Sequence, residues 1–129
     1  MALYFNVVPK VNPRSPRDGE YRYYAVLKSL GLVDEHEVAR QISAETNLSP
    51  QEALFSIHQF EKILLRNLLD GHTVKVGNLG SFSLTINSRG CSTAEEVTEQ
   101  CIKNVNLNFR PSENVKQAIN TAQFYSFDA

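Results

Sequence analysis

The sequence has few of the features that identify a secreted, membrane or metal-binding protein. Its 129 residues include only two cysteines, Cys91 and Cys101, which are too few for a disulfide framework and follow no metal-ligand spacing. We therefore expect two ordinary reduced thiols. The N-terminus lacks a basic start followed by an apolar run, and no later stretch is long and apolar enough to span a membrane. These absences predict a cytoplasmic protein.

An excess of basic residues, the usual signature of a nucleic-acid-binding protein, is also missing, because the formal net charge is −1. Signals of catalysis are equally scarce. No nucleophile, base and orienting group follow a recognisable spacing, and residues 77–80 have the composition of a hairpin turn and not of a phosphate-binding loop. The sequence therefore predicts no enzyme, no metal and no cofactor.

The strongest positive pattern is a helix in the middle of the chain. Ser49, Pro50 and Glu52 have the spacing of a capping box with proline at the first helical position, so the helix should begin at Pro50. Gly71 is placed to end it. Apolar residues recur at helical spacing in between: Leu54, Ile57, Phe60, Ile63, Leu64, Leu65, Leu68 and Leu69. This stripe is too broad to be covered on one side, which predicts dimerisation through the helix.

After the helix the apolar period changes from helical spacing to alternation. Gly77 and Gly80 flank a tight turn between two short alternating segments, which predicts a β-hairpin with one buried face. The alternating apolar residues are Val74, Val76, Phe82, Leu84 and Ile86.

The helix and hairpin together resemble the HU/integration host factor family of bacterial DNA-bending proteins. In that family the helix end is followed by V-x-L-x-G-F-G-x-F, and residues 70–82 of this chain match it at Val74, Val76, Leu79, Gly80 and Phe82. Phe109-Arg110-Pro111 corresponds to the family's F-K/R-P-G. The resemblance implies an α+β, HU-like intertwined homodimer. It also implies a nucleoid-associated or architectural function, the binding of double-stranded DNA with little sequence specificity.

Residues 1–33 have no counterpart in the minimal domain of that family. Strand-forming residues at 3–8 and 20–30, separated by a proline-containing loop at 9–19, predict an added β-element packed on the same core. We accordingly expect a single domain over residues 1–129, with an HU-like core at 34–122 and a tail at 123–129. Phe124 and Phe127 suggest that the tail docks on the protein.

The remaining segments have weaker patterns that still predict secondary structure. Asp34 is a candidate N-cap for a helix that runs to about Thr46 and buries Val38, Ala39 and Ile42. A short helix is expected after a second N-cap at Thr93. Alternating asparagines at 104–108 predict a strand with a polar and an apolar face, and residues 111–112 should open a last helix.

The side chains that the resemblance and the charge pattern nominate for DNA phosphates are all basic. They are Arg110, Lys116, Lys75, Lys103 and Arg89. The correspondence with basic positions of the family is strongest for Arg110 and Lys116. The alternative is that each is an ordinary solvated cation on a nearly neutral protein.

The chain departs from the family where that family wraps DNA. Ser83, Thr85 and Asn87 replace outward-facing arginines, and the long basic arm is replaced by an acidic segment at residues 91–101. No proline lies between Arg89 and Arg110 to act as an intercalating wedge, so we expect a short footprint and little bending. The alternative function is a dimeric protein-interaction module that has lost DNA bending.

A second candidate DNA contact is the basic loop between the first two predicted strands. Lys10, Arg14 and Arg17 lie among three prolines, a composition that suits an extended arm tracking a groove or backbone. The same composition is common in plain surface loops. The sequence leaves both interpretations open.

Overall fold

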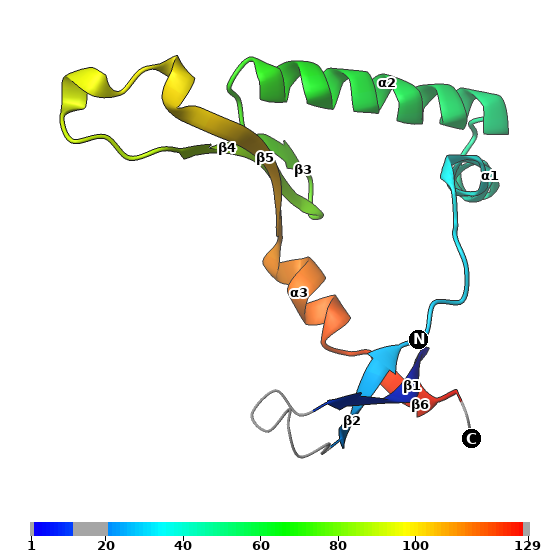
Figure 1. Ribbon diagram of the computed structural model, residues 1–129. Helices are drawn as coiled ribbons and strands as arrows, with labels where there is room; N and C mark the ends of the chain where they lie inside the picture. Colours follow the sequence, from blue (N-terminus) through cyan, green and yellow to red (C-terminus); the bar gives the residue numbers. More distant parts are fainter. Residues whose placement is uncertain (1, 12–20, 128–129) are drawn as a thin grey trace. The chain divides into compact units, whose positions relative to one another are not determined.

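The computed structural model describes residues 2–11 and 21–127, and these fall into two compact units (Figure 1). The terminal unit combines the two ends of the chain, residues 1–32 and 118–129, and the central unit comprises residues 33–117. The fold is α+β, as predicted, with three helices and two three-stranded sheets in the described ranges. The assignment of residues 1–129 to one domain stays a prediction.

The terminal unit contains one sheet built from both chain ends. Strands β1 (Ala2–Val11) and β2 (Tyr21–Leu27) are antiparallel, and β6 (Gln123–Ser126) pairs parallel with the other edge of β1. The Phe127 amide donates to the Phe5 carbonyl at 2.9 Å, and the Phe127 ring packs edge-on against Tyr4. The two predicted N-terminal strands and the docking of the tail are therefore confirmed.

The expected loop from residue 9 onward is partly wrong, because β1 continues to Val11. Pro9 pairs with Tyr23, and Lys10 with Arg22. A proline is tolerated here because β6 is short and pairs only with residues 2–5, so β1 is an edge strand on that side at Pro9. The rest of the predicted loop, with Arg14 and Arg17, lies outside the described residues.

The central unit begins with two helices, α1 (Glu35–Glu45) and α2 (Pro50–Leu69). Both N-termini form as predicted: Asp34 accepts a hydrogen bond from the Glu37 amide, and Ser49 and Glu52 form a complete capping box. Each helix contributes a fully buried alanine, Ala39 and Ala53, whose small side chains allow close packing.

The prediction that α1 also buries two larger side chains is not met in full. Val38 is exposed and Ile42 is only half-buried. Helical spacing identifies a stripe of apolar residues, but it does not say how much of the stripe a neighbouring helix covers. Here the neighbouring helix buries Ala39 and leaves Val38 exposed to solvent.

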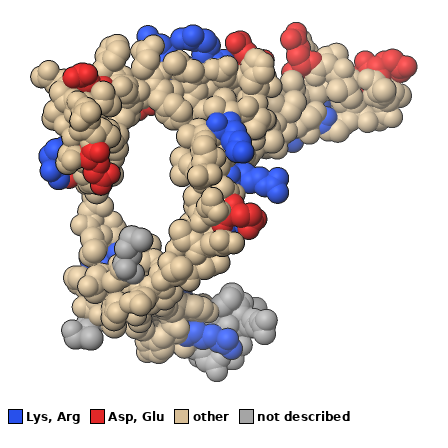
Figure 2. Space-filling model, turned by 180° about the vertical axis from the view of Figure 1, so that it is seen from behind, with Lys and Arg blue, Asp and Glu red and all other residues tan. Residues whose placement is uncertain are grey.

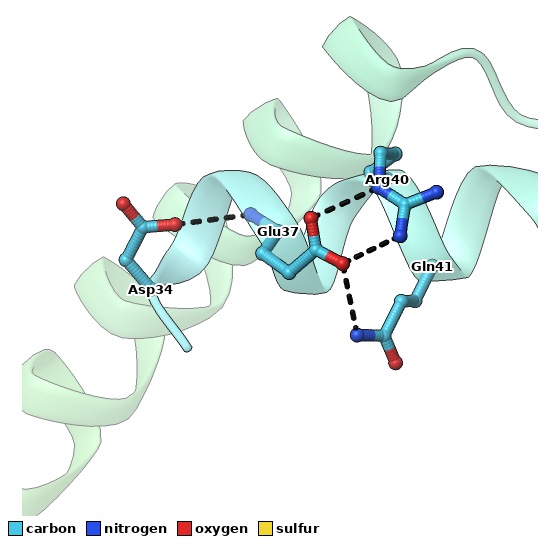
Figure 3. A network of polar contacts seen from close by, with 4 residues as sticks. All are labelled: Asp34, Glu37, Arg40 and Gln41. Carbon is cyan, nitrogen blue, oxygen red and sulfur yellow. Dashed lines mark hydrogen bonds and ion pairs between the residues drawn. The ribbon is translucent and has the colours of Figure 1, made fainter. Parts of the chain in front are cut away.

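The first turns of α1 carry a polar network on the outer surface (Figure 3). Both carboxylate oxygens of Glu37 accept hydrogen bonds from Arg40, at 2.9 and 2.5 Å, and Gln41 adds a third at 3.3 Å. The hydrogen bonds from Arg40 and then from Gln41 lower the pKa of Glu37 from 4.5 to about 2. This carboxylate therefore stays ionised in weak acid.

The second sheet of the molecule follows α2 and is antiparallel, in the order β3 (Val74–Val76), β4 (Gly80–Ser88) and β5 (Ile102–Pro111). Its register pairs Phe82 with Phe109, Leu84 with Leu107 and Ile86 with Val105, so one face is apolar. The other face pairs Ser83 with Asn108, Thr85 with Asn106 and Asn87 with Asn104. The predicted hairpin and the two faces of the strand are confirmed. The expected burial of the apolar face is not, because Ile86, Val105 and Leu107 are each more than half exposed in the single chain.

The segment that joins β4 to β5 does not form the expected helix. It contains two single 3-10 turns, η1 (Ala94–Glu96) and η2 (Glu99–Cys101), and Thr93 makes no side-chain cap. The Glu96 carbonyl accepts hydrogen bonds from the thiols of Cys91 and Cys101, not from an amide one helical turn further on. The β-branched Val97 and Thr98 also favour extended backbone over a continuous helix.

The last helix, α3 (Glu113–Ile119), starts as predicted. The Ser112 hydroxyl accepts a hydrogen bond from the Val115 amide at 3.2 Å and donates one to the Asn78 carbonyl, while the Ser112 amide donates to the Leu79 carbonyl at 3.1 Å. These bonds hold the start of α3 against the turn between β3 and β4.

Gly80 is the position where this sheet has no room for a side chain. A Cβ atom there would collide with the Arg110 carbonyl and lie 2.9 Å from the Phe109 ring, and Gly80 has a φ of +153°. Both the steric contact and the positive φ require glycine.

The Glu37 network gives a prediction about pH. A carboxylate whose pKa falls on folding contributes stability that is present above its unfolded value, here 4.5, and lost as pH falls through the folded value, about 2. Arg40→Met should raise the pKa of Glu37 toward 4.5, as followed by NMR titration of the carboxyl carbon, and so remove most of this pH-dependent contribution. Lys62→Met, which removes a cation of α2, should leave the Glu37 titration unchanged.

The close approach at Gly80 gives a prediction about stability. Gly80→Ala should lower the free energy of unfolding by more than about 2 kcal/mol, because the new methyl group must displace backbone and the positive φ is strained. Gly90→Ala is the matched control, since a Cβ there meets nothing within 4 Å; it should change the value by less than about 0.5 kcal/mol. Equal urea midpoints for the two variants would contradict the steric argument.

Candidate nucleic-acid interface

Three of the five predicted DNA-contacting cations line one pocket of the central unit. Lys75 of β3, Arg110 of β5 and Lys116 of α3 surround a polar hollow of about 430 Å³, together with Ser81 and Ser112. Figure 2 shows basic side chains grouped where β5 meets α3, with acidic ones beside them. Three cations from three elements around one hollow suit the capture of an anion.

The sheet register explains why these side chains meet. Lys75 pairs with Ser81, and Ser81 pairs in turn with Arg110, so the three lie in one row across the polar face. Lys116 lies beside this row because Ser112 holds the start of α3 against the turn between β3 and β4. The two serine hydroxyls at the pocket were not among the predicted contacts, although short hydroxyl side chains commonly bind phosphate oxygens.

One acidic side chain moderates the charge of the pocket. Glu113 pairs with Lys116 at 3.6 Å, and the Glu113 side chain is 80% exposed. An exposed pair of this kind contributes little energy and is easily exchanged for another anion. Lys116 therefore remains available to a phosphate.

The other two predicted cations lie at the far end of the ribbon formed by β4 and β5. Arg89 directly follows β4, and Lys103 is the extra residue of β5 at a register irregularity beside Asn87 and Ser88. The eight residue-to-residue steps from Ser81 to Arg89 span roughly 27 Å of extended strand. The structure thus separates the five cations into two groups.

The polar face between these two groups carries no charge. Its side chains are Ser83, Thr85, Asn87, Asn104, Asn106 and Asn108. The first three stand where the resemblance to the HU/integration host factor family implies outward-facing arginines. Asn108 donates a hydrogen bond to Thr85 at 2.7 Å across the ribbon. This face can form hydrogen bonds with a polyanion but cannot attract one from a distance.

Two further observations bear on the predicted contacts. Lys10 lies in β1 with its ammonium 5.7 Å from the centre of the Tyr24 ring, so it belongs to the ordered sheet and not to a loop. Arg14 and Arg17 lie outside the described residues.

Sequence reasoning missed a contact between the two cysteines. Their Sγ atoms are 3.5 Å apart, although ten positions separate them in the chain. No spacing rule could find the pair, because only the folding of residues 91–101 brings the thiols together. In the described part of the chain no three metal-ligating side chains gather.

The terminal unit has an apolar hollow of its own. Leu3 and Phe5 of β1, Ala25 and Leu27 of β2, and Phe124 of β6 line a space of about 520 Å³ on one face of the sheet. Leu27 and Phe124 are largely exposed. Within residues 2–11 and 21–127, no helix is long and apolar enough to cross a membrane.

Comparison with known protein families identifies the family of this chain. Residues 1–126 match the family described as "HU domain fused to wHTH, Ig, or Glycine-rich motif", abbreviated HU-HIG. The chain belongs to the HU-HIG family. No curated protein matches it.

Several solved structures match this HU-HIG chain, and one of them shares its fold over nearly the whole chain. It comes from Bacteroides vulgatus ATCC 8482 and is described as a putative bacterial DNA binding protein. The likeness covers 98% of this chain with a TM-score of 0.66 at 12% sequence identity. The match covers 48% of that protein, so the HU-HIG chain spans about half its length.

Proposed function

We propose that this HU-HIG chain binds double-stranded DNA with little sequence specificity, as a homodimer with a nucleoid-associated or architectural role. The observation that carries the proposal is the pocket lined by Lys75, Arg110 and Lys116. Family membership and the description of the B. vulgatus protein as DNA-binding point the same way. Contacts of cations with phosphates carry no sequence information, which is why we propose low specificity.

The proposed dimer is supported by apolar surface that the single chain leaves open. Ile86, Val105 and Leu107 are more than half exposed on the apolar face of the β3-β4-β5 sheet, and Phe55, Leu65 and Leu69 are likewise exposed on α2. Apolar surface of this extent is typical of a protein-protein interface. A second copy would cover it and double the number of cationic pockets.

Arg110 provides the sharpest test of the phosphate-binding proposal. Arg110→Gln should weaken binding about equally for duplexes of different sequence, because a phosphate contact is lost. The slope of log K against log salt should fall in magnitude by roughly one per lost contact, or about two in a symmetric dimer. Mobility-shift titrations of two unrelated duplexes at several salt concentrations measure both quantities.

The matched control for this test is Lys62→Gln, which removes a cation of α2 that is not part of the pocket. It should change neither affinity nor slope appreciably. If both variants lose the same affinity, diffuse attraction and not a defined site holds the DNA.

The dimer is tested separately from DNA binding. Sedimentation of the wild-type chain at micromolar concentration should show a dimer. Leu65→Asp should yield monomer or unfolded protein, since a charge buried without a partner at an interface costs several kcal/mol. Gln51→Asp, at an exposed position near the start of the same helix, should remain dimeric. A folded wild-type monomer at that concentration would remove the dimer from the proposal.

A protein-interaction module on the same scaffold is the second candidate function. The apolar hollow of the terminal unit, lined by Leu3, Leu27 and Phe124 among others, favours it, because a bound partner would cover that face. Salt distinguishes the two functions. A protein partner held by apolar contact stays bound at high salt, whereas DNA affinity falls steeply.

A further inference from the structure

The two cysteines lie at opposite ends of the segment that joins β4 to β5. The Arg89 amide donates to the Cys101 carbonyl at 2.7 Å, which continues the ribbon one step beyond β4 and fixes the backbone beside both thiols. Cys91 and Cys101 both point at the Glu96 carbonyl, at 3.8 and 3.6 Å, and their Sγ atoms are 3.5 Å apart. The folded chain therefore already holds the two sulfurs in contact.

We propose that Cys91 and Cys101 are a redox-active dithiol, which closes into an intramolecular disulfide and locks residues 91–101 at the end of the β4-β5 ribbon. Disulfide formation requires the sulfurs to approach by about 1.5 Å more, to a bond of about 2.05 Å. The inference does not depend on DNA binding.

The exposure of the two thiols sets the order of the reaction. Cys91 is half-buried, whereas Cys101 is only 2% exposed. A disulfide oxidant such as oxidised glutathione therefore reaches Cys91 first. The Cys91 thiolate attacks one glutathione sulfur, a mixed disulfide forms, and one reduced glutathione leaves.

The Cys101 thiolate completes the exchange from inside the segment. It attacks the Cys91 sulfur and expels the second reduced glutathione. The protein loses two electrons and two protons in total, and one oxidised glutathione becomes two reduced molecules. No other co-reactant is needed.

The surroundings of Cys101 favour its thiolate. A hydrogen bond from the Thr98 backbone, followed by the one from Cys91, lowers the pKa of the Cys101 thiol. The Arg89 guanidinium, 3.8 Å from the Cys101 sulfur, acts in the same direction. A thiol with a lowered pKa is ionised in a larger fraction of molecules, which supports the second step.

The disulfide would fix the most acidic part of the chain. Glu95, Glu96 and Glu99 lie within the closed loop, where Figure 2 shows acidic side chains at the end of the ribbon. Because both 3-10 turns are already formed around the thiols, closure costs little further ordering. The folded chain should therefore form this disulfide much more readily than the unfolded chain.

Equilibration with glutathione tests this directly. The full chain, either folded or unfolded in urea, is incubated in mixtures of reduced and oxidised glutathione. The reaction is quenched with acid, free thiols are alkylated, and mass spectrometry measures the fraction of chains that carry the disulfide. At half-oxidation the ratio [GSH]²/[GSSG] is the effective concentration of one thiol at the other, which is about millimolar for a short flexible connection. We expect a value at least tenfold higher for the folded chain than for the unfolded chain.

Several results would overturn the proposal. An effective concentration in the folded chain equal to or below that of the unfolded chain would show that folding does not hold the thiols for bonding. Oxidation to disulfide-linked pairs of chains would show that they bond elsewhere. The order of attack has its own test: the lone thiol of the Cys91→Ser variant should react with oxidised glutathione at least tenfold more slowly than that of Cys101→Ser, and equal rates would contradict it.

Discussion

The close approach of β5 to Gly80 is the contact on which the candidate interface depends. Since Gly80 has no side chain, the Arg110 backbone and the Phe109 ring pack directly against it. This sets the register that places Arg110 in one row with Ser81 and Lys75. It also brings Ser112 against the turn between β3 and β4. The hydrogen bonds of Ser112 there fix the start of α3 and therefore the position of Lys116. A steric requirement at one residue thus organises the charge of the pocket.

The distribution of charge resolves an apparent conflict with the composition. A net charge of −1 gives no long-range attraction for a polyanion, but the net charge says nothing about where the charges lie. Three cations gather at one end of the β4-β5 ribbon, whereas at the other end Arg89 and Lys103 lie near three glutamates. The face between them is polar and neutral. Such a ribbon suits contact with a polyanion at one end only.

Small side chains and open apolar surface characterise the packing. In the described ranges the buried apolar residues are Ala39, Ala53, Leu68 and Cys101, while many larger apolar side chains are exposed. A chain of this length ordinarily buries a larger core. Part of the missing burial concerns α2 and the apolar face of the β3-β4-β5 sheet, the surfaces that the proposed dimer would cover, and part concerns the strands of the terminal unit. The hollow of the terminal unit is a separate apolar surface.

Local chemistry in the sequence determined most of the secondary structure: the caps at Asp34 and Ser49, the change of period after Gly71, and the polar and apolar faces of β5. These features depend on neighbours within a few residues, which is why pattern reasoning finds them. Tertiary structure alone decided the rest. It extended β1 past Pro9 by leaving one side of that strand unpaired, replaced the helix after Thr93 with turns bonded to two thiols, and separated Arg89 and Lys103 from the other cations. The extent of β1 and the grouping of the cations depend on residues far apart in the chain. The turns after Thr93 depend on thiols five positions from the Glu96 carbonyl, a contact that no helical or strand period encodes.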